Sequence, residues 1–256
     1  MKGLRKREFP FYYAKGRNLF HIVAKTTDEP GSMSKILALL SPRVNFIGIN
    51  AYSLEDDSAI FSAFAEGLVP DETAAKIRSL LISSEAVLDG EVMPGHDGIL
   101  VDTFHTGLEA HGDEMMTIRR KAMTGMLARI SGLLGSGGET VLYEEGKAIG
   151  RINTEETIRI IGRKRVIANI AYLRKWLQAL GWGEVSATIK KDGTHFVIRD
   201  CFECAQDRDY RTGCHFFRGY IVGSRGVQYG IDPLSKEVKC MMKGDKVCEF
   251  ILSPRR

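Results

Sequence analysis

The segment from residue 213 to 250, GCHFFRGYIVGSRGVQYGIDPLSKEVKCMMKGDKVCEF, holds three of the five cysteines of the chain. Cys214 stands at its start, and Cys240 and Cys248 stand near its end. Glu237 precedes Cys240 by three positions. Thiolates and carboxylates both bind zinc in proteins, so this segment is a candidate metal site.

The spacing of these cysteines differs from that of the zinc ribbon, whose knuckles have C-x-x-C spacing. It instead predicts that a helix start and two hairpin strands meet at one point. Zinc prefers four tetrahedral ligands, and three cysteines leave one position. Candidates for the fourth ligand are Glu237, Cys204, Cys201 and His215. The alternative is that the cysteines are buried small hydrophobic residues in a reducing cytosol.

Cys201 and Cys204 have C-x-x-C spacing, but they follow a predicted strand, His195–Phe202. Residues three apart on a strand face opposite sides, so both can face one metal only if the strand ends in a turn at Glu203. The two possibilities remain open from the sequence.

Around these cysteines the pattern predicts an α+β domain. A helix is expected over 212–229, where Gly219, Gly223 and Gly226 give one bare face that suits close packing against another element or a ligand. Further elements are expected in the following ranges: a helix over 113–134 that is stopped by Gly135-Ser136-Gly137-Gly138, a helical region over 153–180 broken near Gly162, a hairpin of 184–190 with 195–202, and a terminal hairpin of 237–242 with 246–252.

Five segments of this half, GSGGETVLYEEGKAIG, ALGWGEVSATI, FVIRDCFECA, GCHFFRGYIVG and EVKCMMKGDKVCEF, resemble the 4-vinyl reductase domain over about 110–252. Such domains are the sensor parts of bacterial activators that respond to phenols. In related archaeal regulators, cysteines of this domain act as redox switches. A subunit of the TRAPP vesicle-tethering complex shares the fold. The resemblance implies a structural zinc held by Cys214, Glu237, Cys240 and Cys248, with Cys204 as second choice for the fourth ligand. It also implies a pocket for a hydrophobic or aromatic ligand, with these candidate contacts: Trp176, Trp182, Phe216, Phe217 and Tyr220. Trp182 is interpreted alternatively as a core anchor.

The N-terminal part follows the order βαββαβ, which is typical of the ferredoxin-like plait. Strands are expected at 19–25, 44–54, 59–65 and 85–92, with helices that begin at Ser32 and Asp71 as N-caps.

A strand ending in D-x-P-G, a short helix and the sequence VNFIGI resemble the ACT domain, a small regulatory module, over about 17–93. The resemblance implies an amino-acid site, often across a dimer interface, at the positions Asp28, Pro30, Gly31, Asn45, Gly48 and Ile49. Pro-Gly and Asn are equally ordinary turn chemistry.

Composition fits a globular protein, with 44% hydrophobic and 27% charged residues and a net charge of +4. We expect an ACT-like domain with a basic N-terminal arm at 1–93, a linker at 94–98 and the second domain at 99–256. No apolar run reaches the roughly 20 residues of a membrane span, and the N-terminus lacks the apolar core of a signal peptide. A cytoplasmic location is therefore expected, and basic clusters are interpreted as solvated surface before nucleic-acid contacts.

These features favour a non-catalytic, homodimeric sensor that binds a hydrophobic or aromatic ligand in a zinc-braced domain and an amino acid in the other. One alternative is a redox-sensing transcriptional regulator that uses the cysteine cluster. Another is an accessory subunit of a tetrapyrrole vinyl reductase, although the sequence carries no dinucleotide or flavin fingerprint.

Overall fold

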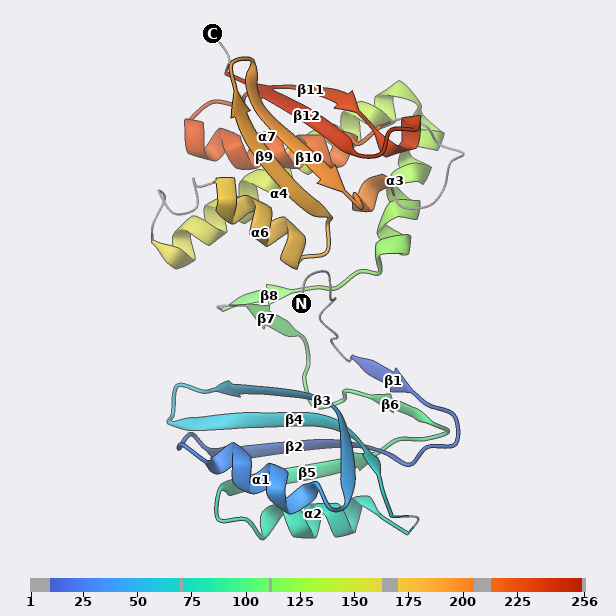
Figure 1. Ribbon diagram of the computed structural model, residues 1–256, viewed down its shortest axis with the longest axis vertical. Coiled ribbons are helices and arrows are strands. Elements are labelled where there is room, and N and C mark those ends of the chain that lie inside the picture. The colour runs from blue at the N-terminus through green and yellow to red at the C-terminus, as the bar shows by residue number, and fades with distance from the viewer. Residues whose placement is uncertain (1–9, 70, 111, 163–169, 205–212, 255–256) are drawn as a thin grey trace. The chain divides into compact units, whose positions relative to one another are not determined.

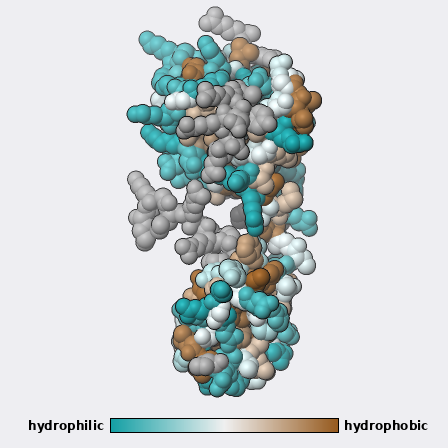
Figure 2. All heavy atoms as spheres, turned by 90° about the vertical axis from the view of Figure 1, so that its right-hand side faces the viewer, coloured by the Kyte–Doolittle hydropathy of each residue, from teal (hydrophilic) through white to brown (hydrophobic). Residues whose placement is uncertain are grey.

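The computed structural model describes residues 10–69, 71–110, 112–162, 170–204 and 213–254. The chain forms two compact α+β units, Met1–Leu108 and Glu109–Arg256. None of the helices in the described ranges combines the length and apolar character that a bilayer crossing requires. On the face drawn in Figure 2, hydrophilic side chains cover most of each unit, with small groups of hydrophobic ones between them.

The N-terminal unit contains a four-stranded antiparallel sheet with two helices on one face (Figure 1). Its elements in chain order are β2 (Leu19–Thr27), α1 (Ser32–Leu40), β3 (Val44–Ser53), β4 (Ser58–Gly67), α2 (Ala74–Ile82) and β5 (Val87–Pro94). The strands lie in the order β3-β4-β2-β5. The predicted βαββαβ order is confirmed.

Alternation along β2 explains why the two faces of this sheet differ. Phe20 and Ile22 point to the helical face, where they join the core formed with Ile36 of α1 and Leu81 of α2. His21 lies between them in sequence and therefore points to the opposite face. A smaller cluster on that opposite face contains Leu19, Phe64 and Leu100.

Both helices of this unit begin differently from the prediction. Ser32 is the first residue of α1, because Gly31 takes the cap position with a left-handed φ of 97°. α2 is capped by Thr73, whose side chain accepts the backbone N–H of Lys76. Asp71 is not the cap.

The predicted linker at 94–98 belongs to the N-terminal unit and is not a domain boundary. It turns the chain from β5 into β6 (Ile99–Val101), which pairs antiparallel with β1 (Phe11–Tyr13). The division lies after Leu108. Beyond it, β7 (Leu108–Ala110) pairs with β8 (Asp113–Met115), so the helix expected from 113 begins only at Arg120.

The C-terminal unit has a four-stranded antiparallel sheet in the order β11-β12-β10-β9. Its elements after β8 are α3 (Arg120–Leu134), α4 (Ser136–Ile161), α6 (Ile170–Ala179), β9 (Glu184–Lys190), β10 (Gly193–Arg199), the 3₁₀ turn η1 (Phe202–Cys204), α7 (His215–Tyr229), β11 (Leu234–Lys239), the 3₁₀ turn η2 (Met241–Lys243) and β12 (Cys248–Ser253). Both predicted hairpins are present, with bounds that differ by a few residues.

The helix predicted to stop at the cluster Gly135-Ser136-Gly137-Gly138 does so, since α3 ends at Leu134 with Gly135 as its C-cap. Only Gly135 leaves helical geometry, at φ 55° and ψ −133°, and α4 starts directly after it. The break predicted near Gly162 is confirmed, because Gly162 ends α4 in the left-handed conformation at φ 65°. The predicted start at 153 is wrong, since α4 begins at Ser136.

Helices α4 and α7 pack backbone to backbone through glycines on both of their facing surfaces. A Cβ atom added at any of these glycines would meet a carbonyl oxygen of the other helix; the pairs are Gly146 with Phe216, Gly150 with Tyr220, Gly219 with Tyr143 and Gly223 with Lys147. Of the bare face predicted for the helix at 212–229, Gly219 and Gly223 lie against α4, whereas Gly226 lies against Asp232.

The first prediction concerns this contact. We expect Gly223→Ala to lower the free energy of unfolding by about 1–3 kcal/mol or more, because the new methyl group would meet the Lys147 carbonyl, which is backbone. The matched control is Gly125→Ala in α3, where an added Cβ has open space. Since alanine favours helix, the control should stabilise the protein by about 0.5–1 kcal/mol. Urea denaturation of both variants measures the difference, and equal stabilities would contradict the close contact.

The second prediction concerns a buried histidine on β10. His195 contacts Glu249 of β12 through Nδ1 at 2.9 Å and Asp192 through Nε2 at 2.9 Å. Hydrogen bonds to Glu249 and then to Asp192 raise the pKa of His195 above its ordinary value near 6.5. The resulting stabilisation is complete below the unfolded-state pKa and is lost as pH rises through the higher folded-state pKa.

The free energy of unfolding should therefore fall as pH rises from about 6.5 through the higher folded-state pKa, and His195→Gln should remove that part of the slope. Urea denaturation of wild type and variant across this pH range measures the difference. The matched control is His96→Gln, since His96 is exposed. An unchanged slope in His195→Gln would show that the two carboxylates do not hold the imidazolium.

Candidate metal centre

All five cysteines of the chain converge on one buried point of the C-terminal unit. They come from the loop after β10 (Cys201), η1 (Cys204), the residue before α7 (Cys214), the residue after β11 (Cys240) and the first residue of β12 (Cys248). All are free thiols, and four of them are buried while Cys204 is partly buried. Cysteines that lie up to 47 residues apart in the sequence thus form one cluster.

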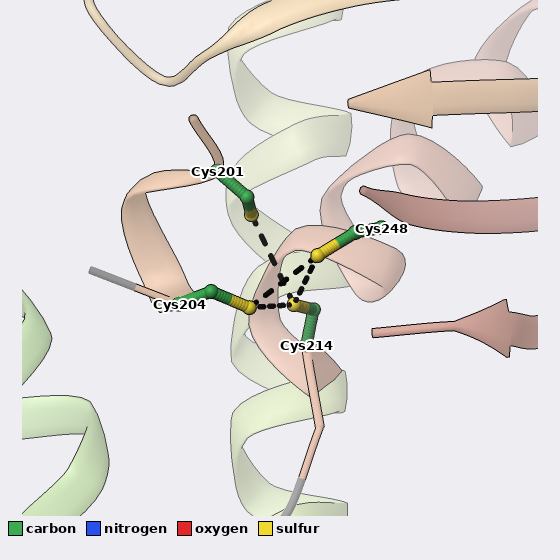
Figure 3. A group of neighbouring side chains, drawn as sticks. All are labelled: Cys201, Cys204, Cys214 and Cys248. Carbon is green, nitrogen blue, oxygen red and sulfur yellow. Dashed lines mark hydrogen bonds between the residues drawn. The ribbon is translucent and has the colours of Figure 1, made fainter. Parts of the chain in front are cut away.

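The sulfur atoms lie at contact distance of one another. The Sγ of Cys204 is 2.9 Å from that of Cys214, 3.4 Å from that of Cys248 and 3.8 Å from that of Cys240. The Sγ of Cys214 is 3.5 Å from Cys248 and 3.8 Å from Cys240. Cys201 stands at the edge, 3.9 Å from Cys214. Figure 3 shows the side chains of Cys204, Cys214 and Cys248 pointing toward one another.

A turn after β10 allows both cysteines of the C-x-x-C pair to join the cluster. β10 ends at Arg199, and Asp200 has a positive φ of 51° that breaks the strand. The 3₁₀ turn η1 then replaces the strand, so side chains no longer alternate between two faces. Cys201 and Cys204 therefore both reach Cys214. Of the two possibilities left open by the sequence, the structure has the turn.

Glu237 lies at the rim of the cluster with both carboxylate oxygens in use. Oε1 accepts the backbone N–H of Cys214 at 2.9 Å, and Oε2 accepts from Lys243 Nζ at 3.1 Å. The carboxylate is within 4.8 Å of the sulfurs of Cys214 and Cys240. It therefore lies where the predicted ligand should lie, but its observed partners are protein N–H groups.

Further polar groups lie around the cysteines, and the sequence analysis assigned them no role at the metal site. Glu203 is buried and accepts the backbone N–H groups of Phe216 and Phe217 in the first turn of α7, at 3.0 and 2.7 Å. Burial raises the pKa of Glu203 to about 8, although the two donors act in the opposite direction. Asp245 accepts the backbone N–H of Cys240 at 2.8 Å. Glu203 could have been singled out in the sequence because it lies between the two cysteines of the C-x-x-C pair.

Hydrogen bonds among the thiols shift the pKa values of Cys248 and Cys214 in opposite directions. Hydrogen bonds from the other cysteines, with Cys201 the first contributor, lower the pKa of Cys248. The same network, again with Cys201 first, raises the pKa of Cys214. Met241 also directs its backbone N–H to the Cys248 sulfur at 3.5 Å. The form of a cysteine that binds metal is the thiolate.

The donor set fits zinc. Tetrahedral zinc with Zn–S bonds near 2.3 Å separates its sulfur ligands by about 3.8 Å. The distances within the cluster, 2.9–3.9 Å, bracket this value. A metal here would tie η1, α7 and the β11–β12 hairpin together.

The predicted aromatic pocket is a packed core in this structure. Trp182 contacts four aromatic rings at centroid distances of 4.6–6.0 Å; they belong to Phe202, Phe216, Phe217 and Tyr220. The interpretation of Trp182 as a core anchor is correct. Beside it lies a cavity of about 10 Å³, which Trp176 and Tyr220 line. That volume holds about one water molecule.

The six positions predicted for an amino-acid site do not form one site within a single chain. Asp28, Pro30 and Gly31 follow the last residue of β2. Asn45 lies at the other end of the sheet, since it pairs with Glu66, which pairs with Leu19 at the start of β2. Gly48 and Ile49 are in the middle of the edge strand β3. The amino-acid site stays a prediction.

Comparisons with known proteins give distant similarities. No family model matches the chain. An uncharacterized protein of Methanocaldococcus jannaschii is 30% identical over 119 residues, which are 46% of this chain and 66% of the relative.

Three solved structures are also similar. The phenol-responsive sensory domain of the transcription activator PoxR has a TM-score of 0.46 and 14% identity, over 88% of this chain and 92% of that one. A vinyl-4-reductase family protein from Methanocaldococcus jannaschii has a TM-score of 0.39 and 18% identity, over 56% and 85%. A trafficking protein particle complex subunit 3 from Naegleria fowleri, covalently bound to palmitic acid, has a TM-score of 0.40 and 14% identity, over 53% and 97%. At these scores the similarity assigns neither ligand nor activity to this chain.

The third prediction separates the candidate ligands. Cys204→Ser and Cys240→Ser should each lose zinc and lower the melting temperature, because metal binding at a structural site is coupled to folding. Glu237→Gln should keep zinc, since the amide oxygen can still accept the Cys214 N–H. The matched control is Cys201→Ser at the edge of the cluster, which should also keep zinc. Elemental analysis and thermal denaturation measure both effects.

If Glu237→Gln loses zinc while Cys204→Ser keeps it, the ligand is the carboxylate and not the fourth thiolate. If no variant changes metal content or melting temperature, the cluster is not a metal site.

Proposed function

We propose that the protein is a non-catalytic small-molecule sensor whose C-terminal unit holds a small aromatic ligand and is braced by a structural zinc ion. The observation that carries the proposal is the buried thiol cluster at the start of α7. Four closed thiolate ligands leave no open coordination position for substrate or water, which is the arrangement of structural rather than catalytic zinc.

The proposed zinc ligands are Cys204, Cys214, Cys240 and Cys248. Three of them are those implied by the resemblance to the 4-vinyl reductase domain. Cys204 takes the fourth position in preference to Glu237, because its sulfur is within 3.8 Å of the other three and the Glu237 oxygens already accept N–H groups. Glu237 then acts as a positioning residue, since it holds the Cys214 backbone. Outer groups of this kind orient metal ligands.

The proposed ligand site is the small cavity between α4, α6 and α7. Its wall combines the Trp176 ring with groups that can form hydrogen bonds, among them Asn153, Tyr172 and Tyr220. Asn153 Nδ2 donates to the Tyr220 hydroxyl at 3.5 Å, which is a long and replaceable bond. An aromatic ring that carries one hydroxyl group matches this lining. Entry of such a ring requires the cavity to widen, because about 10 Å³ admits only water.

A redox-sensing regulator is the second candidate, and one distance favours it. The sulfurs of Cys204 and Cys214 are only 2.9 Å apart, and Cys201 supplies a further thiol that a four-ligand site does not need. An oxidant could take two electrons and two protons from Cys204 and Cys214 to form a disulfide, with release of zinc.

For the N-terminal unit, the ACT-like role remains part of the proposal. β3 is an edge strand whose exposed apolar side chains include Ile49 and Tyr52. An exposed strand edge is a template for pairing with a second chain. This supports a homodimer with the amino-acid site at its interface.

The fourth prediction tests the ligand site with phenol as the probe. Phenol should raise the melting temperature of the full chain, with a stabilisation of about 2.7 kcal/mol at 100 times its dissociation constant. Tyr220→Phe should weaken phenol binding, because the variant loses the hydroxyl that faces the cavity. Calorimetric titration and the fluorescence of Trp176 and Trp182 measure binding.

The matched control is Tyr229→Phe, which removes a hydroxyl from the same helix at an exposed position. It should bind phenol as wild type does. No stabilisation by phenol or related aromatics, together with zinc loss and a reversible disulfide on oxidation, would favour the redox regulator instead.

A further inference from the structure

A second group of metal-ligating side chains lies in the N-terminal unit, far in sequence from the cysteines. His21 comes from the middle of β2, on the sheet face opposite α1 and α2. Asp102 and His105 come from the segment that follows β6. One potential ligand atom of each lies within 4.8 Å of those of the other two.

The imidazole of His21 is fully buried, yet one of its ring nitrogens lacks a partner. Nε2 is 2.9 Å from the Ser62 hydroxyl. Among the residues that the structure describes, Nδ1 has no hydrogen-bond partner, and the carboxylate of Asp102 stands 3.8 Å from it, beyond hydrogen-bond range. A buried polar atom without a partner is costly and uncommon in native proteins. The space in front of Nδ1 is therefore a candidate position for a bound group.

A cation would give this nitrogen a partner and would lie beside the negative charge of the Asp102 carboxylate. A divalent metal at about 2.0–2.2 Å from nitrogen and oxygen ligands holds them roughly 3–3.5 Å apart, close to the observed 3.8 Å. His105 Nδ1 already contacts Asp102 Oδ2 at 2.8 Å, so its ring is directed at the same carboxylate. Binding of metal at this nitrogen would replace that hydrogen bond.

The surroundings orient the three side chains as a metal site requires. The Ser62 hydroxyl holds Nε2 of His21, which leaves Nδ1 as the free lone pair when Nε2 carries the proton. Asp102 Oδ1 accepts the backbone N–H groups of Phe104 and His105, each at 3.0 Å, and this fixes its carboxylate. Phe64 packs against the His21 ring at a centroid distance of 4.8 Å.

The exposure of the group gives the ion a route and a free position. The side chain of Asp102 is 20% exposed and that of His105 is 27% exposed, whereas His21 is at 0%. Three protein ligands leave one tetrahedral position for water or a small anion. The site thus differs from the closed thiol cluster in both ligand type and access.

We propose that His21, Asp102 and His105 form a second metal site, for zinc or another first-row divalent transition metal. Two imidazoles and a carboxylate suit these borderline ions better than magnesium or calcium, which favour oxygen ligands alone. The proposal is independent of the thiol cluster and of the proposed sensor function.

Cobalt(II) titration of the full chain tests it, because thiolate and imidazole sites give different spectra. Cobalt in the thiol cluster gives intense thiolate-to-metal absorption, whereas cobalt bound to nitrogen and oxygen gives only weak bands. Wild type should bind one cobalt ion beyond those that produce thiolate absorption. His105→Ala should lose that ion while its thiolate absorption is unchanged. Since His105 is partly exposed, this variant should fold even if substitution of the buried His21 disrupts β2.

The matched control is His96→Ala, an exposed histidine of the same unit, which should keep both kinds of cobalt. Asp102→Asn should weaken binding of the same ion at least tenfold, with thiolate absorption again unchanged. The proposal is overturned if wild type binds no cobalt beyond the thiolate-bound fraction, or if His105→Ala and Asp102→Asn bind as much as wild type. Loss of thiolate absorption alone would count against the zinc clamp and not against this site.

Discussion

The backbone contact between α4 and α7 is the constraint on which the C-terminal unit depends. Glycines on both helices let carbonyl oxygens of one helix lie where side chains of the other would stand. Residues larger than glycine would separate the two helices and shift the start of α7. Cys214 stands at that start, so the position of the thiol cluster follows from the packing of two helices. Close packing of this kind makes such cores sensitive to a single added methyl group.

The start of α7 also concentrates charge that the fold must balance. Buried Glu203 accepts two backbone N–H groups there, and hydrogen bonds from the other thiols lower the pKa of Cys248. Negative groups near a helix N-terminus are favourable, but several buried together repel one another. A divalent cation among the sulfurs would offset this repulsion. Burial is the main cause of the raised pKa of Glu203, and the nearby Glu237 and Cys248 add to that effect.

Much of the architecture could be predicted from local patterns, and the failures share a cause. Alternation along β2 and the amphipathic helices were sufficient for the βαββαβ order, which depends on neighbours in sequence. The segment at 94–98 resembles a linker by composition. In the fold, Gly98 lies against the backbone of Ala14. Such tertiary contacts override local propensity and leave no local signal.

The candidate site shows the same division between local and long-range information. The three cysteines of the C-terminal segment could be grouped by motif, whereas the role of Cys204 depended on a turn that the sequence left open. The group of His21, Asp102 and His105 had no signal at all, because a histidine inside the apolar run of β2 resembles an ordinary core residue.

X-ray absorption at the zinc edge of the purified full chain tests the proposed four-sulfur zinc site most directly. In a His105→Ala variant, we expect zinc surrounded by four sulfur atoms of the C-terminal cluster. A shell of three sulfurs and an oxygen, or protein without zinc, would contradict the four-thiolate site.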